Sequence, residues 1–162
     1  MEISKLNNNI TPSGTMAISN KARILKEQGK PVIGFGAGEP DFPTPSHVIE
    51  EVKIASENPA YHKYTAVGGL PILRDEISRT TKKYSNFEID PDNVVVTNGG
   101  KQAILTTFMS LLDPGDEVLI PSPYWTTYPE AVKISGGDPI VVDTDFENDF
   151  KVTVEQLEEK FT

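Results

Sequence analysis

Residues 94–125, VVVTNGGKQAILTTFMSLLDPGDEVLIPSPYW, constrain the fold more than any other part of the chain. A β-branched run predicts a strand over 94–97, helical periodicity predicts a helix over 100–112, and a second apolar run predicts a strand over 117–120. A strand, crossover helix and strand in this order form a parallel pair with a right-handed connection. The stretch therefore predicts an α/β fold that is built on a parallel sheet.

The flanking sequence continues the alternation of helices and strands. Further helices are predicted over 13–28, from Thr44, from Pro71, over 126–135 and from Thr153, and further strands over 31–35 and 139–142. We expect Thr44 to cap the helix that Pro45 opens, because its hydroxyl can accept from free amides of the first turn. Thr153 and Gln156 match a capping box. The polar segment 1–10 is expected to be an extended arm that is ordered only if it packs on something else.

The composition excludes several classes of function. With 15 Lys plus Arg against 24 Asp plus Glu, the net charge of -9 would repel a nucleic-acid backbone. The chain has no cysteine, so it has no disulfide, no thiolate nucleophile and no cysteine-ligated metal, and its two histidines are too few for most histidine metal sites. It has no apolar run of signal-peptide or membrane-helix length, and we expect a cytoplasmic protein.

A candidate anion site lies where the first predicted strand becomes a helix, at Asn98, Gly99, Gly100 and Lys101. The first amides of a helix lack intrahelical partners and lie at the positive end of its dipole, and glycine lets an anion approach closely. A bare glycine pair is also typical of a flexible turn without a ligand, and this alternative stays open here. A lysine is disfavoured at a helix start unless a phosphate or carboxylate lies beside it.

Two nucleotide-binding motifs do not fit the spacing of the glycines. A P-loop requires a glycine where the chain has Val95, and a hydroxyl where it has Gln102. The segment GFGAGE at 34–39 resembles a dinucleotide fingerprint, but a glutamate occupies the third glycine position and the prolines that follow prevent an immediate helix. Neither motif accounts for the candidate anion site.

Tyr124 and Trp125 follow the second predicted strand, at the end of the sheet where open α/β folds bind ligands. An aromatic ring at this place can stack on a planar ligand, although aromatic residues also fill the edges of sheets as ordinary packing. The prolines around Ser122 constrain the corner, and a cis bond between Ser122 and Pro123 would suit a sharp turn. Together with the glycine pair, this corner suits a ligand that has a phosphate and a planar ring.

Four segments carry a resemblance to the N-terminal half of class I pyridoxal-phosphate aminotransferases, and most of all to the bacterial aspartate aminotransferase subgroup. They are AGEPDFPTP at 37–45, KYTAVGGLPILRDEI at 63–77, NGGKQA at 98–103 and LLDPGDEVLIPSPYWTTYPE at 111–130. The resemblance implies an incomplete three-layer αβα large domain of fold type I, with an N-terminal arm and helix. It assigns 1–30 to the arm and helix, a small-domain contribution in the family, and 31–162 to the first half of the cofactor domain.

The resemblance also implies cofactor contacts for individual residues. Gly99, Gly100 and Lys101 match the loop that holds the phosphate of pyridoxal 5'-phosphate. Trp125 matches the aromatic residue that stacks on the pyridine ring. Tyr64 matches a tyrosine that reaches the phosphate bound by the other subunit, which implies a homodimer with shared sites, although a surface tyrosine is the plain alternative.

Contacts with the substrate are implied at three of the positions. Gly38 matches a glycine whose backbone meets the α-carboxylate of the substrate, although it could simply permit a turn. Trp125 matches a residue that also lies against the substrate, and Lys101 one that is associated with the side-chain carboxylate of acidic substrates. The implied reaction transfers an amino group between aspartate or glutamate and a 2-oxo acid.

The resemblance assigns no catalytic and no metal-binding residue to this chain. In the family, the lysine that forms a Schiff base with the cofactor lies in a later part of the sequence. We therefore expect the chain to be an N-terminal fragment that is inactive alone and, with unpaired strand edges, prone to aggregation or dependent on another chain. Two alternatives stay open: another class I aminotransferase of alanine, aromatic or prephenate type, or a non-enzymatic module for anion binding or dimerisation.

Overall fold

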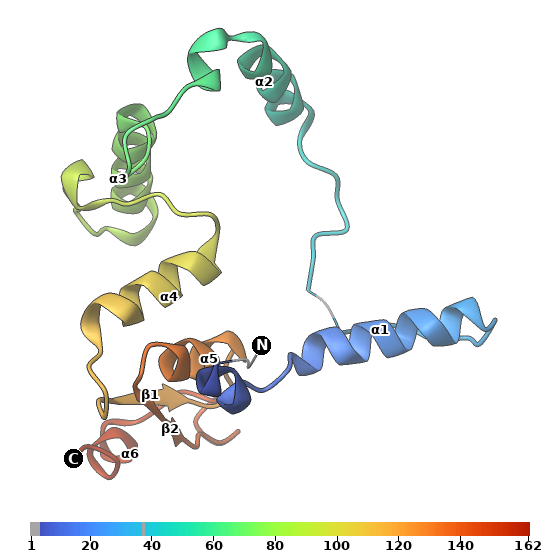
Figure 1. Ribbon diagram of the computed structural model, residues 1–162, viewed down its shortest axis with the longest axis vertical. Helices are drawn as coiled ribbons and strands as arrows, with labels where there is room; N and C mark the ends of the chain where they lie inside the picture. Colours follow the sequence, from blue (N-terminus) through green and yellow to red (C-terminus); the bar gives the residue numbers. More distant parts are fainter. Residues whose placement is uncertain (1–3, 37) are drawn as a thin grey trace. The chain divides into compact units, whose positions relative to one another are not determined.

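The computed structural model describes residues 4–36 and 38–162 (Figure 1). The first three residues of the predicted arm, and Ala37 of the AGEPDFPTP motif, lie outside the described residues. The chain divides into two compact units, one formed by Met1–Gly38 with Gly99–Thr162 and the other by Glu39–Asn98. The predicted division into 1–30 and 31–162 stays a prediction, since these units are defined by contacts within this chain alone.

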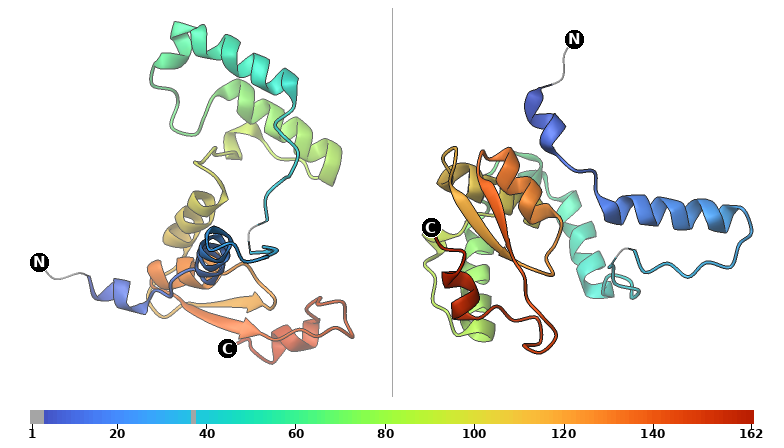
Figure 2. Two further views of the ribbon diagram at one scale, coloured as in Figure 1. Left: turned by 90° about the vertical axis from the view of Figure 1, so that its right-hand side faces the viewer. Right: turned by 90° about the horizontal axis from the view of Figure 1, so that it is seen from below.

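The first unit is organised around two parallel strands, β1 (Glu117–Pro121) and β2 (Asp138–Val142). Their register runs from Glu117 opposite Asp138 to Pro121 opposite Val142. The connecting helix α5 (Thr127–Ile134) packs on both strands, which Figure 2 shows in two further views. The core of the unit lies between them; its buried side chains are Ile120, Ala131, Val132 and Val142. The predicted parallel sheet is confirmed for this pair.

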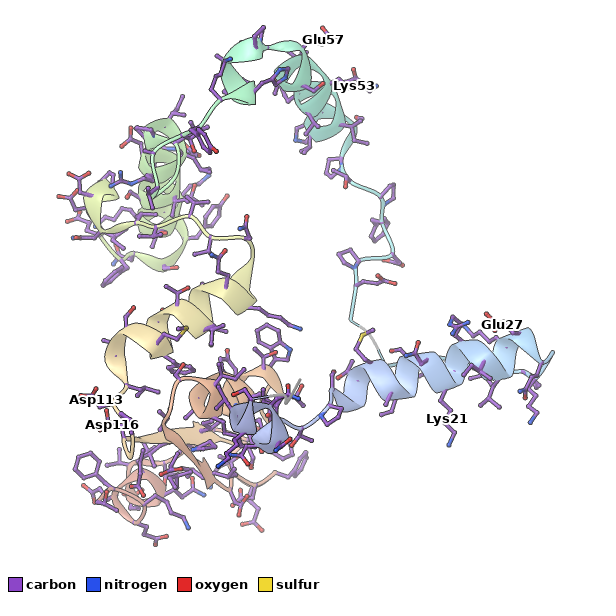
Figure 3. All side chains as sticks on the ribbon, in the orientation of Figure 1. Lys21, Glu27, Lys53, Glu57, Asp113 and Asp116 are labelled. Atoms are coloured by element: carbon purple, nitrogen blue, oxygen red, sulfur yellow. The ribbon has the colours of Figure 1, made fainter. Side chains whose placement is uncertain are left out.

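Helix α4 (Gly100–Leu111) packs on α5 and leads into β1 through a tight turn. In that turn the Asp113 amide donates to Asp116 Oδ2 at 2.8 Å, and the Asp116 amide donates to the Asp113 carbonyl at 3.1 Å. Both aspartates are labelled in Figure 3. Gly115 has φ +96° in this turn, a conformation that glycine adopts without strain. The local sequence DPGD therefore fixes the exit from α4.

The helices at the two ends of the chain begin where the sequence predicts. Helix α1 (Gly14–Glu27) follows Ser13, whose hydroxyl accepts from the Met16 amide at 3.4 Å. It is preceded by the 3-10 turn η1 (Lys5–Asn9). Helix α6 (Val154–Glu158) starts at a complete capping box, in which Thr153 and Gln156 satisfy each other's amides. These starts are confirmed because side chains only three residues away specify them.

The second unit contains helices α2 (Ser46–Glu57) and α3 (Pro71–Ser85) with the 3-10 turns η2 (Pro59–His62) and η3 (Pro91–Asn93). Arg74 links α3 to η3, because its guanidinium donates to the Pro91 carbonyl and to Asp92, each at 2.8 Å. The predicted cap at Thr44 is wrong: Pro45 takes the N-cap position of α2, and no side chain caps that helix. The extended ψ of 139° at Pro45 delays the helix by one residue.

The strands predicted at 94–97 and 31–35 are absent from the structure. Val94 is buried and the Val96 amide donates to the Gly68 carbonyl at 2.9 Å, but no neighbouring strand pairs with this run. In the other run Ile33 and Phe35 are largely exposed, at 82% and 92%. A strand needs hydrogen bonds from a neighbour, and within the described residues only β1 and β2 supply them to each other.

Candidate functional site

Two glycines form the entrance to α4. Gly99, at the N-cap, has φ +81° and ψ 169°, and no side chain caps the helix there. A Cβ added at Gly99 or Gly100 would meet nothing within 4 Å, so the backbone borders open space. The left-handed φ of Gly99 would strain any other residue. An anion can therefore approach the first turn of α4 closely, where the helix dipole favours negative charge.

An aromatic surface lies next to this helix start, at the beginning of α5. The Nζ atom of Lys101 lies 5.8 Å from the centroid of the Trp125 ring, within the range of a cation–π contact. Tyr128 meets the same ring edge-on, with 5.8 Å between centroids and an interplanar angle of 87°. Trp125 is 45% exposed, so part of its ring remains accessible to a planar ligand. The predicted cis bond between Ser122 and Pro123 is confirmed at this corner.

A cavity of about 750 Å³ joins this surface to the N-terminal arm. Its walls come from three places in the sequence: the arm from Ile10 to Met16, α4 through Lys101 and Leu105, and the corner and helix from Tyr124 to Ile134. Figures 1 and 2 show η1 beside α5. The sequence predicts Lys101 and Trp125 as site residues but does not predict the arm as a wall, because no local signal pairs residues so far apart.

The contact that places the arm is made by Glu130. Its Oε2 atom accepts from the Thr11 amide at 2.9 Å, across 119 residues of sequence, and its Oε1 atom lies 3.1 Å from Lys133 Nζ. The Glu130 side chain is 19% exposed. Burial raises the pKa of Glu130, but hydrogen bonds from Thr11 and Lys133 outweigh it, and the pKa lies below its ordinary value. The carboxylate is therefore charged at neutral pH.

The structure brings four of the predicted site residues together in the first unit: Gly99, Gly100, Lys101 and Trp125. Gly38 lies in a loop of the same unit, and a Cβ there would meet nothing within 4 Å. Tyr64 belongs to the second unit, where its side chain is fully exposed. The structure therefore brings together the residues that are predicted to contact the phosphate and the ring, while the Tyr64 side chain lies on the surface of its unit.

Two negative findings concern the described part of the chain. Residues 4–36 and 38–162 contain no group of three His, Cys, Asp or Glu side chains that could hold a metal ion. None of the helices in these same ranges is long and apolar enough to cross a membrane.

Comparison with known proteins identifies the family. The family model for aminotransferases of class I and II matches residues 30–162. The chain belongs to this family. The class I resemblance noted from the four sequence motifs is thereby confirmed, and the family depends on pyridoxal phosphate and acts on amino acids and 2-oxo acids.

Individual aminotransferases match nearly the whole chain. An aspartate aminotransferase from Streptomyces avermitilis is 53% identical over 92% of the chain, and an aspartate/prephenate aminotransferase from Nitrosomonas europaea is 43% identical over all of it. The solved structure of Thermus thermophilus aspartate aminotransferase with maleate covers the whole chain at 37% identity and a TM-score of 0.92. The chain spans only 36%, 41% and 42% of these three proteins. The predicted aminotransferase fold, present in part, is confirmed.

Proposed function

We propose that this chain supplies the phosphate-binding and ring-stacking half of an aspartate aminotransferase site. The observation that carries the proposal is the meeting of Lys101 and Trp125 beside the glycine entrance to α4, along one cavity. The names of the relatives support acidic amino acids as substrates, since the aspartate aminotransferase from Streptomyces avermitilis is 53% identical to this chain over 149 residues. The longer protein would act in the cytoplasm on aspartate or glutamate and a 2-oxo acid.

The residues present fit pyridoxal 5'-phosphate. A Cβ at Gly99 or Gly100 would meet nothing within 4 Å at the positive end of a helix, which leaves room for the phosphate, and the exposed part of Trp125 suits the pyridine ring. Lys101 would contribute positive charge to this end of the site. When bound, the cofactor supplies an electron sink for negative charge on the α-carbon of the amino acid.

The roles of this chain are binding and orientation. We assign Gly99, Gly100, Lys101, Trp125 and Tyr64 to the cofactor, and Gly38, Lys101 and Trp125 to the substrate. Lys101 can pair with a carboxylate of an acidic substrate, which favours aspartate over alanine. We assign proton transfer to no residue of this chain, and we expect the 162-residue chain alone not to convert aspartate and 2-oxoglutarate.

The full exposure of Tyr64 supports a homodimer in which each subunit completes the site of the other. A tyrosine hydroxyl is free to donate to a phosphate across such an interface. In the longer protein, Tyr64→Phe should weaken cofactor binding without lowering the fraction of dimer. Sedimentation and cofactor titration separate the two effects, and an unchanged cofactor affinity would remove Tyr64 from the site.

The binding half of the proposal is tested on the 162-residue chain. Trp125 is the only tryptophan, so its fluorescence reports directly on ligands at the corner. Pyridoxine 5'-phosphate, which lacks the reactive aldehyde, should quench it with an affinity at least about tenfold above that of pyridoxine, because only the former offers a charge-assisted partner for the amides. Equal affinities would contradict a phosphate site at Gly99 and Gly100.

Two lysine variants localise this binding. Lys101→Met should weaken pyridoxine 5'-phosphate binding, since it removes the cation beside Trp125. Lys21, which is labelled in Figure 3, lies on α1. Lys21→Met serves as the control, because it changes the net charge by the same amount. Equal losses in both variants would indicate general electrostatic attraction instead of a site.

A second candidate is an aspartate/prephenate aminotransferase, which the Nitrosomonas europaea relative favours by its name. The longer protein separates the two activities when it is assayed with aspartate and either 2-oxoglutarate or prephenate as acceptor. Amino transfer to prephenate at a kcat/KM comparable with that for 2-oxoglutarate would establish the second candidate. A non-enzymatic module, by contrast, would retain phosphate binding and transfer no amino group in either assay.

A further inference from the structure

Little buried surface holds the N-terminal arm against the cavity. None of residues 5–16 is buried, and α1, which they lead into, has no buried residue. The arm nevertheless forms one wall of the cavity that contains Lys101 and Trp125. A segment with so little buried apolar surface opens at low cost in free energy, so individual polar contacts decide its position.

One such contact joins the arm to α5. The Thr11 amide donates to Glu130 at 2.9 Å, and Pro12, the next residue, has no amide to donate. The acceptor is a charged carboxylate that is only 19% exposed and is fixed on its other oxygen by Lys133. A bond of this kind is stronger than a neutral one, because one partner carries full charge.

The place of Glu130 in the cavity gives this contact a consequence for ligands. Thr11 and Glu130 both line the cavity, as do Ser13 and Thr15 just beyond the attachment point. If the attachment is lost, the wall that carries Ser13 and Thr15 can leave, and Trp125 becomes more accessible to water. A ligand that binds when the arm is already in place does not lose free energy to order the arm. A ligand that binds when the arm is detached must offset that cost.

We propose that Glu130 is a positioning residue that holds the N-terminal arm against the cavity of Lys101 and Trp125 through the Thr11 amide. Glu130 is not one of the residues that we assign to the cofactor or to the substrate. The proposal rests on the proposed function only for the identity of the ligand, and the attachment of the arm is testable with no ligand present.

Four variants of the 162-residue chain test the attachment. Glu130→Ala removes the acceptor, and Thr11→Pro removes the donor while leaving α5 intact. Ile10 before it already has the extended φ of -90° and ψ of 126° that a residue preceding proline adopts. Glu130→Gln keeps an acceptor oxygen without charge, and Lys133→Ala keeps the carboxylate without its ion pair.

Hydrogen exchange of the arm amides over residues 8–18 is the first readout. We expect Glu130→Ala and Thr11→Pro to accelerate exchange there by about tenfold, with smaller increases for Glu130→Gln and Lys133→Ala. The double variant Glu130→Ala, Thr11→Pro should exchange no faster than either single variant, because both remove one interaction. Additive effects, or a Thr11→Pro arm that exchanges like the wild type, would overturn the proposal. Exchange in β1 and β2 shows whether a variant has unfolded.

Acrylamide quenching of Trp125 fluorescence is the second readout. Quenching should increase in Glu130→Ala and Thr11→Pro to the same extent and remain at the wild-type value in Lys21→Met. Since no cofactor is used, failure of the proposed function leaves this result unaffected. Quenching that stays unchanged in both arm variants would show that the arm does not cover the cavity.

In the longer protein the same variants separate positioning from catalysis. Glu130→Ala and Thr11→Pro should raise KM for the amino acid by about tenfold while kcat changes less, because the arm must be ordered again at each binding event. Glu130→Gln should restore part of the loss. A fall in kcat with an unchanged KM would contradict a positioning role.

Discussion

The segments 117–121 and 94–97 have similar apolar sequences but different structures. EVLIP forms strand β1, with β2 beside it and α5 across it, and Ile120 is buried there. VVVT has no partner strand among the described residues; the Val96 amide donates to the Gly68 carbonyl, and Val94 is buried. The difference teaches that strand propensity selects an extended backbone, whereas a neighbouring strand decides whether a sheet forms.

A buried charge in the paired region should have the largest effect. Val132 of α5 is fully buried against the strands, and Val132→Asp should destabilise the first unit by more than about 4 kcal/mol because the carboxylate would be unpaired and dry. The loss of stability is measured by urea unfolding and by hydrogen exchange of the amides in β1 and β2. Val95→Asp, at a valine that is 67% exposed in the unpaired segment, is the matched control. Equal losses in both variants would remove the contrast between the two regions.

A methyl group at Gly69 should loosen the unpaired segment. Gly69 has φ +104°, and an added Cβ would lie 2.6 Å from a methyl group of Val96. Gly69→Ala should cost roughly 2 kcal/mol in the second unit through backbone strain and displacement of Val96. Faster exchange of residues 94–97 would report it. Gly115→Ala has the same backbone strain with open space around the Cβ, so it separates strain from the clash.

Removal of the Arg74 side-chain bonds should weaken the turn that precedes the unpaired segment. The Arg74 side chain is 17% exposed and donates to the Pro91 carbonyl, so Arg74→Met should cost about 1 to 2 kcal/mol. Lys53→Met, which breaks an exposed pair with Glu50 on α2, should cost less than about 0.5 kcal/mol. Lys53 is labelled in Figure 3. The shift of the urea midpoint from the wild-type value measures each loss. Equal shifts in the two variants would contradict the role of Arg74.

Acid should release the arm from α5 by protonating Glu130. We expect this effect to be the smallest of the four. The pKa of Glu130 in the folded chain lies below its ordinary value of 4.5, so its stabilisation is present above that value and is lost as pH falls through the lower one. Lys133 is paired with Glu130 at 3.1 Å, and Lys101 lines the same cavity. Acrylamide quenching of Trp125 should be constant from about pH 7 to about pH 5 and should rise only below the ordinary pKa. A rise near neutral pH would contradict this assignment.

The helices were predictable from sequence because their signals are local. Ser13 and the pair Thr153 and Gln156 mark the starts of α1 and α6, and the turn at Asp113–Asp116 marks the exit from α4. The failure at Thr44 came from the backbone of Pro45, which holds an extended ψ and moves the helix start to Ser46. Caps and turns close in sequence thus predict where the helices begin and end, with errors of about one residue at an end.

The candidate site was predictable in part for the same reason. Gly99, Gly100 and Lys101 stand next to one another in sequence, and Trp125 follows the strand that the same unit contains. The arm could not be found this way, because the bond between Thr11 and Glu130 depends on how α5 and the arm meet after folding. Sequence motifs resolve contacts within one turn or loop, whereas they carry no information on a particular pair 119 residues apart.

The sequence by itself determined the helices, the turns, the aminotransferase family and the short run of residues that suits a phosphate and a ring. Only the tertiary structure decided which apolar runs became strands and which segment formed a wall of the cavity. The reason is physical: caps and turns are satisfied by groups within a few residues, but a strand and a cavity wall are satisfied by groups that only folding brings near.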